Sequence, residues 1–349
     1  MSLSPLVGVA RKAAGPPPAG VADLDALAET LCLVMLQQER QVFWRRGDQV
    51  AASQLAAGVV PSHLRHHGAV LSALVAAGLL EREGELLALG PHAHEALVQR
   101  DAVRSRARRH HPRHLELLEH VVAALPALWR GAAHPFEVLF PRGSVALMRG
   151  VYCGNPLADR TNRIIAACVG HEVAAIRDHA PAVLEVGGGT GGTTGDVLRA
   201  VGEARYIFTD VSPAFLTAAR QRFPGCKTAT YDVGHDPTAQ GLETGSCDVV
   251  LATNALHTAP LILPAVQGLR TLLRPGGLLV LGELTRVHSL WTVCAGVLDG
   301  WWTAADSRLP DAPLLSREGW ERVLGELFSE IAFVDEHAGP YGQDVILAR

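Results

Sequence analysis

The sequence has few cysteines, no long apolar run and no large excess of charge of one sign, and each absence excludes a class of protein. Its six cysteines are scattered without a C-x-x-C pair, which is typical of reduced thiols rather than of a disulfide framework or a zinc site. The apolar runs have only the length of strands, so we expect no signal peptide and no membrane partner, and we predict a cytoplasmic protein. The net charge of −4 gives no general attraction to nucleic acid. No cluster of ligating side chains indicates a metal.

Apolar spacing and turn residues divide the 349 residues into three predicted parts. Residues 1–20 contain the run Gly15–Pro18, and we predict a flexible lead-in there. Residues 21–178 show helical periodicity and two short strands around Gly84, which predicts a helical, winged-helix-like subdomain followed by a lid. Residues 179–349 alternate strands with helices, which predicts an α/β domain with a parallel sheet and helices on both faces.

The third predicted helix of the N-terminal part carries Arg65, His66 and His67, which a DNA-binding protein would use. A recognition helix usually carries more positive charge than this one. We therefore expect no nucleic acid partner. The sequence favours a packing module or a homodimer formed through this subdomain.

A cationic segment lies between residues 100 and 114. It is a poor metal site, because adjacent histidines on a helix face different directions. A solvated helix face is one interpretation, and a surface for an acidic partner such as an acyl carrier protein is the other. The charged residues are Arg100, Arg104, Arg106, Arg108, Arg109 and Arg113, with His110, His111 and His114.

The strongest motif is a short apolar strand that runs directly into a glycine-rich turn and a helix. Glu185, Gly187, Gly189 and Gly191 follow the order E-x-G-x-G-x-G, and such glycines let a ligand lie against bare backbone at a helix N-terminus. A dinucleotide fingerprint also fits the loop through Gly192, so a nicotinamide oxidoreductase is a rival interpretation. The carboxylate before the first glycine favours S-adenosylmethionine, whose cationic methionine end needs a counter-charge and which has no pyrophosphate.

Acidic residues after the next two predicted strands complete an adenosine site. The predicted strand 205–209 is followed by Asp210, whose carboxylate can accept both hydroxyls of a ribose. The predicted strand 226–231 is followed by Asp232, which can accept an adenine amino group while Val233 packs against the ring. Together with the glycine turn, these residues predict a binding site for the methyl donor.

Two further predicted strands, 248–253 and 278–283, supply a candidate base. The first is followed by Asn254, which we assign to the donor site, and by His257, whereas the second ends in Glu283. If the strands are neighbours, Glu283 can accept a proton from one imidazole nitrogen of His257 and raise the basicity of the other. The methyl group of a sulfonium is already activated, so the protein mainly aligns the acceptor and removes its proton.

Two stretches are candidates for an acceptor pocket. A Gly/Pro-rich loop carries Tyr152 and Asn155, whose composition suits a structural role as well as a functional one. Trp301 and Trp302 offer large rigid apolar surfaces, with core packing as the alternative. His288 has no evident partner, and we assign it to the surface.

As a set, these motifs resemble the methyltransferase domains of modular polyketide synthases. The likeness is carried by residues 184–194, 206–215, 254–257, 273–277, 300–302 and 313–316, and by the lid stretches 140–144 and 152–155. It implies a class I S-adenosylmethionine-dependent methyltransferase fold, a Rossmann-like sheet whose last strand is antiparallel. It also implies that His257 and Glu283 act as the catalytic pair and that Tyr152 and Asn155 line the acceptor site.

The resemblance leaves the acceptor open, because some members methylate the α-carbon of a β-ketoacyl thioester and others methylate a β-hydroxyl. We predict α-carbon methylation of a carrier-bound β-ketoacyl intermediate. The alternative is O-methylation of a polyketide-like or small natural-product acceptor. Family members usually lie between other synthase domains, whereas this sequence begins with Met1. A free-standing enzyme with a small-molecule acceptor and an excised domain with an acyl-carrier-protein-bound acceptor are therefore both considered, and a non-catalytic scaffold is the rival from another class.

Overall fold

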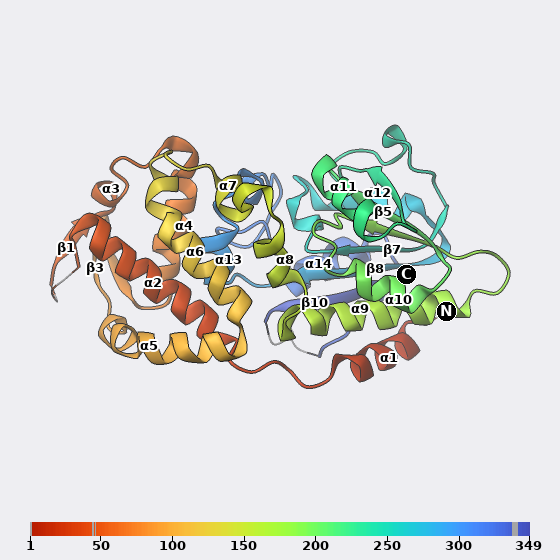
Figure 1. Cartoon of the computed structure of the whole chain (residues 1–349), viewed down its shortest axis with the longest axis horizontal. Coiled ribbons are helices and arrows are strands. Elements are labelled where there is room, and N and C mark those ends of the chain that lie inside the picture. Colours follow the sequence, from red (N-terminus) through yellow and green to blue (C-terminus); the bar gives the residue numbers. More distant parts are fainter. Residues whose placement is uncertain (1, 44, 46, 337–340) are drawn as a thin grey trace. The chain divides into compact units, whose positions relative to one another are not determined.

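The computed structural model describes residues 2–43, 45, 47–336 and 341–349, and the chain divides into two compact units (Figure 1). Unit 1 comprises residues 1–18, 152–286 and 303–349, and unit 2 comprises residues 19–151 and 287–302. Each unit is therefore assembled from separate segments of the chain. Helix α9 (Pro156–Ala175), which we predicted as part of the N-terminal subdomain, lies in unit 1.

Unit 1 is built on a seven-stranded sheet with the order β6-β5-β4-β7-β8-β10-β9. The first five of these strands are parallel, and β10 is antiparallel to both β8 and β9. This confirms the predicted α/β fold with an antiparallel last strand. The strands are β4 (Ala182–Val186), β5 (Arg205–Asp210), β6 (Lys227–Thr230), β7 (Cys247–Thr253), β8 (Leu273–Leu284), β9 (Ile331–Phe333) and β10 (Gln343–Ala348).

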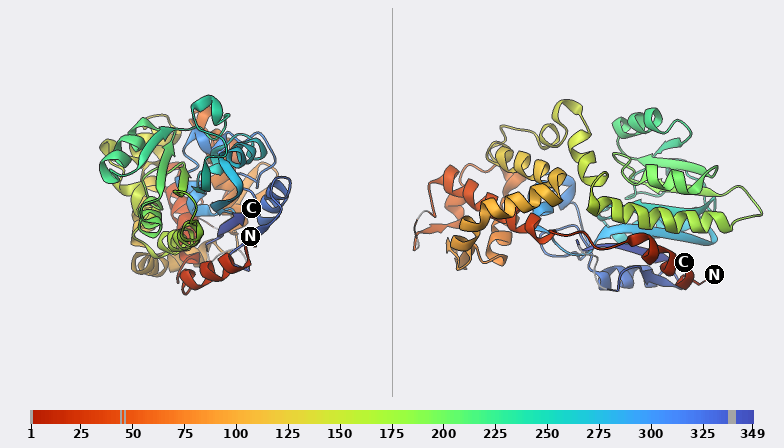
Figure 2. Two further views of the ribbon diagram at one scale, coloured as in Figure 1. Left: turned by 90° about the vertical axis from the view of Figure 1, so that its right-hand side faces the viewer. Right: turned by 60° about the horizontal axis from the view of Figure 1, so that its bottom comes forward.

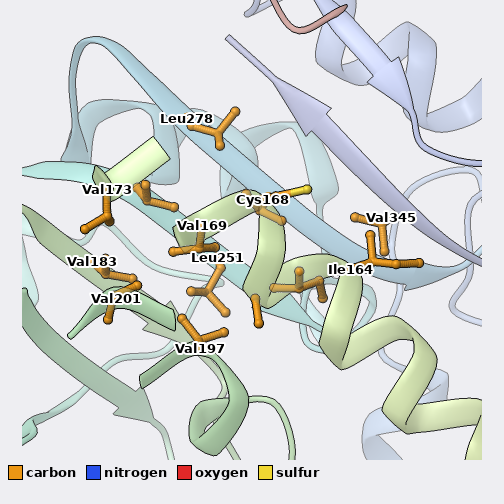
Figure 3. Packing of buried hydrophobic residues seen from close by; sticks show 14 of the residues in the cluster. Ile164, Cys168, Val169, Val173, Val183, Val197, Val201, Leu251, Leu278 and Val345 are labelled. Carbon is orange, nitrogen blue, oxygen red and sulfur yellow. The ribbon is translucent and has the colours of Figure 1, made fainter. Parts of the chain in front are cut away.

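Side chains that alternate along the central strands supply a separate core on each face of the sheet. On one face, Val183 and Leu251 pack against Ile164 and Val169 of α9, as Figure 3 shows. On the other face, Leu184 belongs to a second buried apolar cluster, which includes Val266 and Leu269 of α12 (Ile262–Leu272). Because both faces are buried, the strands are apolar over most of their length. The helices of this unit are α1 (Ser4–Ala14), α9, α10 (Thr194–Val201), α11 (Pro213–Arg222), α12 (Ile262–Leu272) and α14 (Arg317–Gly325), with short 3₁₀ turns η3 (Thr238–Gln240) and η4 (Leu256–Thr258).

The first residues of the chain are not the flexible lead-in that we predicted, since they contain helix α1. Its residues Leu6, Ala10 and Ala14 are buried at helical spacing, and the helix packs against α9 within unit 1 (Figures 1 and 2). Glu330 accepts a hydrogen bond from the backbone N–H of Leu3 at 2.8 Å. The Gly/Pro run itself contains no helix or strand, as its sequence predicts, and it directly follows the end of α1.

We expect Leu6→Ala to lower the free energy of unfolding by about 2–5 kcal/mol, because it removes a buried side chain from the core of unit 1. The matched control is Gly8→Ala in the same helix, where an added Cβ meets no atom within 4 Å. That change is expected to stabilise the protein by about 0.5–1 kcal/mol. Urea denaturation measures both effects. An unchanged midpoint for Leu6→Ala would show that α1 does not pack on the sheet domain.

Unit 2 consists mainly of helices and also contains a small antiparallel sheet of order β1-β3-β2. The predicted strands around Gly84 are present as β2 and β3. Its elements are α2 (Ala22–Arg40), β1 (Gln49–Ala51), α3 (Ala52–Leu55), η1 (Pro61–His63), α4 (Leu64–Ala76), β2 (Leu80–Glu83), β3 (Leu86–Leu89), α5 (Ala93–His110), α6 (Pro112–Trp129), α7 (Pro135–Leu139), η2 (Pro141–Gly143), α8 (Ala146–Tyr152), α13 (Ser289–Cys294) and η5 (Asp299–Trp302). None of the helices in the described part of the chain is both long and apolar enough to cross a membrane.

The three side chains considered for DNA contact make contacts within unit 2. His66 and His67 are buried, and the indole N–H of Trp129 donates to Nδ1 of His66 at 3.1 Å. The ring of His67 meets the ring of Trp129 edge-on at 4.7 Å. The guanidinium of Arg65 lies 4.8 Å from the ring centre of Trp302. All three side chains therefore pack against other residues of unit 2.

Most of the cationic segment is also paired within unit 2. His111 and His114 are buried, and four of the six arginines form ion pairs. A role of this segment toward an acidic partner stays a prediction. The pairs are Arg100–Asp101, Arg104–Glu119, Arg106–Asp23 and Arg113–Glu116.

The buried histidines of unit 2 predict a loss of stability in acid. Burial lowers the pKa of His66 and of His114 to about 3 and that of His67 to about 4. In the unfolded chain these groups take up protons below a pH of about 6.5. Each therefore stabilises the fold fully above that pH and loses about 1.4 kcal/mol per pH unit as the pH falls toward the folded-state pKa.

Thermal unfolding between neutral pH and a pH of about 5 checks this prediction. The variant His114→Gln removes one of the buried titrating groups and is expected to show a smaller fall in Tm with acidification than the wild type. His171→Gln is the control, since His171 is exposed on α9. Equal pH dependence in all three proteins would contradict the account.

Candidate active site

The glycine-rich turn between β4 and α10 has the backbone geometry that its sequence predicts. Gly187 and Gly189 have φ angles of 62° and 53°, a backbone conformation that residues with a Cβ rarely adopt. A Cβ on Gly187 would lie only 2.6 Å from the Cβ of Ala255, so no larger residue fits at that position. At Gly189 the nearest atom that such a Cβ would meet is a carbonyl oxygen 3.8 Å away. The turn therefore leaves room for a ligand against bare backbone.

Asp210 ends β5 and holds the glycine turn. Its carboxylate accepts hydrogen bonds from the N–H of Gly189 at 2.9 Å and the N–H of Ser212 at 2.8 Å, one on each oxygen. Burial raises the pKa of Asp210, and the backbone N–H groups of Ser212, Gly189 and Val211 oppose that rise. A carboxylate can accept about four hydrogen bonds. The two oxygens therefore keep capacity to accept a hydrogen bond from a ribose hydroxyl.

Asp232 and Val233 follow β6, the next strand along the sheet edge. The side chain of Asp232 is half exposed, and one of its oxygens accepts from the N–H of Gly234 at 2.9 Å. The side chain of Gln240 holds the backbone of Asp232 through bonds of 2.8 and 2.9 Å to its N–H and C=O. Val233 is buried beside it. An acidic acceptor next to an apolar side chain suits an adenine, although this assignment stays a prediction.

Asn254 directly follows β7 and has a left-handed backbone conformation, with φ at 50°. Its N–H donates to the C=O of Gly282 at 2.8 Å, which fixes the backbone. Its side-chain Oδ1 is buried and has no hydrogen-bond partner among the residues that the structure describes. A buried acceptor without a donor is costly, so a donor group of a bound ligand would suit it. The glycine turn, the carboxylates and this amide oxygen together fit a nucleoside that carries hydroxyl and amino groups.

Glu185, which we assigned to the donor site, is buried and bound by protein groups. One oxygen of its carboxylate accepts from the hydroxyl of Thr194 at 2.7 Å and from the hydroxyl of Tyr206 at 2.8 Å. Burial raises the pKa of Glu185 to about 7. These bonds join β4 to the first turn of α10 and to β5. A direct role of Glu185 toward the methyl donor stays a prediction.

His257 and Glu283 meet at the carboxyl edge of the neighbouring parallel strands β7 and β8. Nδ1 of His257 lies 2.9 Å from one carboxylate oxygen of Glu283. The other oxygen accepts from the backbone N–H groups of Ala255 and Leu256 at 2.9 and 2.8 Å. A carboxylate oxygen accepts hydrogen bonds, so the tautomer that suits this contact has its proton on Nδ1, facing the fully buried Glu283. The second ring nitrogen, Nε2, is then the one able to accept a proton.

Tyr152 and Asn155, the candidates for acceptor binding, lie where α8 ends and α9 begins: Tyr152 is the last residue of α8, and Asn155 directly precedes α9. Burial and the negative charge of Glu283 raise the pKa of Tyr152 to about 12, so its phenol stays protonated at neutral pH. Asn155 caps the helix, because its Oδ1 accepts from the N–H groups of Leu157 and Ala158 at 3.1 Å each. The cap gives Asn155 a structural role, and acceptor binding by both residues stays a prediction.

Three other residues from the sequence analysis belong to unit 2. Trp301 is buried, and the indole N–H of Trp302 donates to the C=O of Gly296 at 2.8 Å, so their part in an acceptor pocket stays a prediction. His288 is not the surface residue that we expected. It is buried, and its Nδ1 lies 2.7 Å from a carboxylate oxygen of Asp25. Its partner is more than 260 positions away in the sequence, so no local pattern indicated it.

Comparison with known proteins places these features in one family. A methyltransferase domain family matches residues 184–279. The structure of the DszA carbon methyltransferase superposes with a TM-score of 0.83 at 31% identity, over 97% of this chain and 94% of that one. The CurJ carbon methyltransferase gives 0.81 at 28% identity, over 94% and 91% of the two chains.

Curated relatives are much longer proteins. Polyketide synthase ThaQ of Burkholderia thailandensis is 36% identical over 67% of this chain, and polyketide synthase ThaG of the same organism is 34% identical over 85% of it. The chain spans only 12% and 6% of their lengths. The fold, the glycine turn and these matches agree, and the chain belongs to the S-adenosylmethionine-dependent methyltransferase domains of polyketide synthases.

Proposed function

We propose that this chain transfers a methyl group from S-adenosylmethionine to the α-carbon of a carrier-bound β-ketoacyl thioester. His257 is the catalytic base in this proposal, and Glu283 positions it. The observation that carries the proposal is the 2.9 Å contact between the two side chains at the same sheet edge as the glycine turn. The carbon methyltransferases among the structural neighbours support the choice of carbon over oxygen.

The donor site in this proposal is the edge formed by β6, β5, β4 and β7. The glycine turn, Asp210, Asp232, Val233 and Asn254 would hold the nucleoside and its attached amino acid. When bound, S-adenosylmethionine supplies a methyl group that is already activated by its sulfonium. The work left to the protein is to exclude water, align the acceptor and remove its proton.

The acceptor carbon lies between a ketone and a thioester, so its proton is acidic enough for an imidazole to remove. Nε2 of His257 takes that proton, and the charged carboxylate of Glu283 stabilises the imidazolium that forms. The protonated phenol of Tyr152 is able to donate a hydrogen bond to the oxygen on which negative charge develops. General-base catalysis of this kind contributes about 10²–10⁴-fold to a rate.

The same imidazole would also remove a proton from a hydroxyl, so the pair alone does not separate C-methylation from O-methylation. Mass spectrometry of two carrier-bound acceptors, a β-ketoacyl and a β-hydroxyacyl thioester, distinguishes them after incubation with the methyl donor. We expect only the β-ketoacyl chain to gain the mass of one CH₂ group, with the new methyl on the α-carbon. A methyl group on the β-oxygen of the β-hydroxyacyl chain would contradict the proposal.

A further inference from the structure

We propose that Arg308 is a positioning residue for His257, acting together with Asp306. This inference rests on the proposed role of His257 as the base. Arg308 did not stand out in the sequence, because nothing in its local pattern separates it from other arginines. In the structure, it anchors the backbone of the loop that carries the candidate base.

The guanidinium of Arg308 is buried, with only 4% of its side chain exposed. It pairs with the carboxylate of Asp306 and donates to the C=O of Ala259 at 2.9 Å and the C=O of Pro313 at 2.6 Å. It also approaches the C=O of His257 at 3.5 Å. One cation therefore contacts the backbone within the short 3₁₀ turn η4 at His257, directly after the turn at Ala259, and in the segment that runs toward α14 at Pro313.

Further bonds attach the same segment to the loop after β7. The second carboxylate oxygen of Asp306 accepts from the N–H of Ile262 at 2.7 Å. The N–H of Ala305 donates to the C=O of Pro260 at 2.8 Å. The chain enters unit 1 at Thr303, so the stretch that makes these bonds directly follows the connection from unit 2.

The candidate base is thus held by two different sets of bonds. Glu283 binds the imidazole of His257 and the N–H groups of the two preceding residues, Ala255 and Leu256. Arg308 binds the carbonyl oxygen of Ala259, which follows His257 in the chain. A lysine in place of Arg308 would keep the charge but not the planar fork that reaches several carbonyl oxygens at once. A displacement of a catalytic group by about 1 Å can reduce a rate by about 100-fold. Loss of Arg308 is therefore expected to reduce catalysis without weakening the donor site.

The experiment compares Arg308→Lys and Arg308→Ala with the control Arg274→Lys in the whole chain. Arg274 binds the carboxylate of Asp248 at 3.0 Å at the opposite edge of the same sheet, so it controls for the general loss of a guanidinium–carboxylate pair. We expect kcat to fall by about 10-fold for Arg308→Lys and about 100-fold for Arg308→Ala. The Kd of S-adenosylhomocysteine is expected to stay unchanged. The Tm of Arg308→Lys is expected to fall, because buried carbonyl oxygens lose their donors, so kcat is measured well below that Tm.

Hydrogen exchange supplies a readout that is independent of activity. Amides of residues 255–262 are expected to exchange faster in Arg308→Lys than in the wild type, with exchange elsewhere in unit 1 unchanged. An unchanged kcat in Arg308→Lys, or an equal loss in Arg274→Lys, would overturn the inference. If His257→Ala is inactive while Arg308→Lys is fully active, only this inference fails, whereas an active His257→Ala overturns the proposed function itself.

Discussion

Replacing His257 with alanine is expected to reduce kcat for methyl transfer by about 10²–10⁴-fold, because it removes the base that takes a proton from the substrate to be methylated. The donor site should stay intact. Asp210 and Asn254 make their described bonds to the glycine turn and to β8 without any part of the imidazole. The Kd of S-adenosylhomocysteine, measured by calorimetry, is therefore expected to equal that of the wild type.

His171→Ala is the matched control, since it removes an exposed imidazole from the same unit. It should leave both kcat and the Kd of S-adenosylhomocysteine unchanged. If His257→Ala keeps the activity of this control, His257 is not the base. A loss of donor affinity equal to the loss of rate would instead assign His257 to binding.

Replacing Glu283 with glutamine is expected to reduce kcat by up to about 10⁴-fold, the effect expected when the orienting carboxylate of a catalytic histidine becomes an amide. The glutamine oxygen would stay on the N–H groups of Ala255 and Leu256, because an NH₂ group there would face two donors. The NH₂ group would then face Nδ1 of His257 and force the ring proton onto Nε2. The base would thus be present but in the wrong tautomer.

The kinetic and stability effects of Glu283→Gln are separable. The amide leaves no backbone donor without an acceptor, so the loss of stability should be about 0.5–1.5 kcal/mol, the net contribution of one ordinary hydrogen bond. Steady-state kinetics at a temperature well below the Tm measures the rate effect on folded protein. A variant that retains wild-type kcat would show that the carboxylate does not orient the imidazole.

The parts of the site that the sequence predicts lie at strand ends. Alternation of strands and helices predicts a parallel sheet, and the carboxyl ends of its strands share one edge. That rule placed His257 near Glu283, although the two are 26 positions apart, and the structure brings them together. It also placed Asp210 and Asn254 at the same edge.

The features that the sequence did not predict depend on contacts between distant segments. Helix α1 is short, and only its packing against α9 shows that it is not a loose end. Arg308 and His288 take their roles from partners in other segments, which local periodicity does not encode. Glu185 is assigned to the donor site from its place before the glycines and from its charge. Its described bonds run to Thr194 and Tyr206, and a role toward the methyl donor stays a prediction.

The protonation state of the His257 ring tests the central claim most directly. Nitrogen-15 NMR of histidine-labelled protein with S-adenosylhomocysteine, at the pH of the activity assay, reports which ring nitrogen carries the proton. The His257 signals are those lost in the variant His257→Gln. We predict a neutral ring with its proton on Nδ1, bonded to Glu283, and an unprotonated Nε2. A proton on Nε2 and none on Nδ1 would contradict the account.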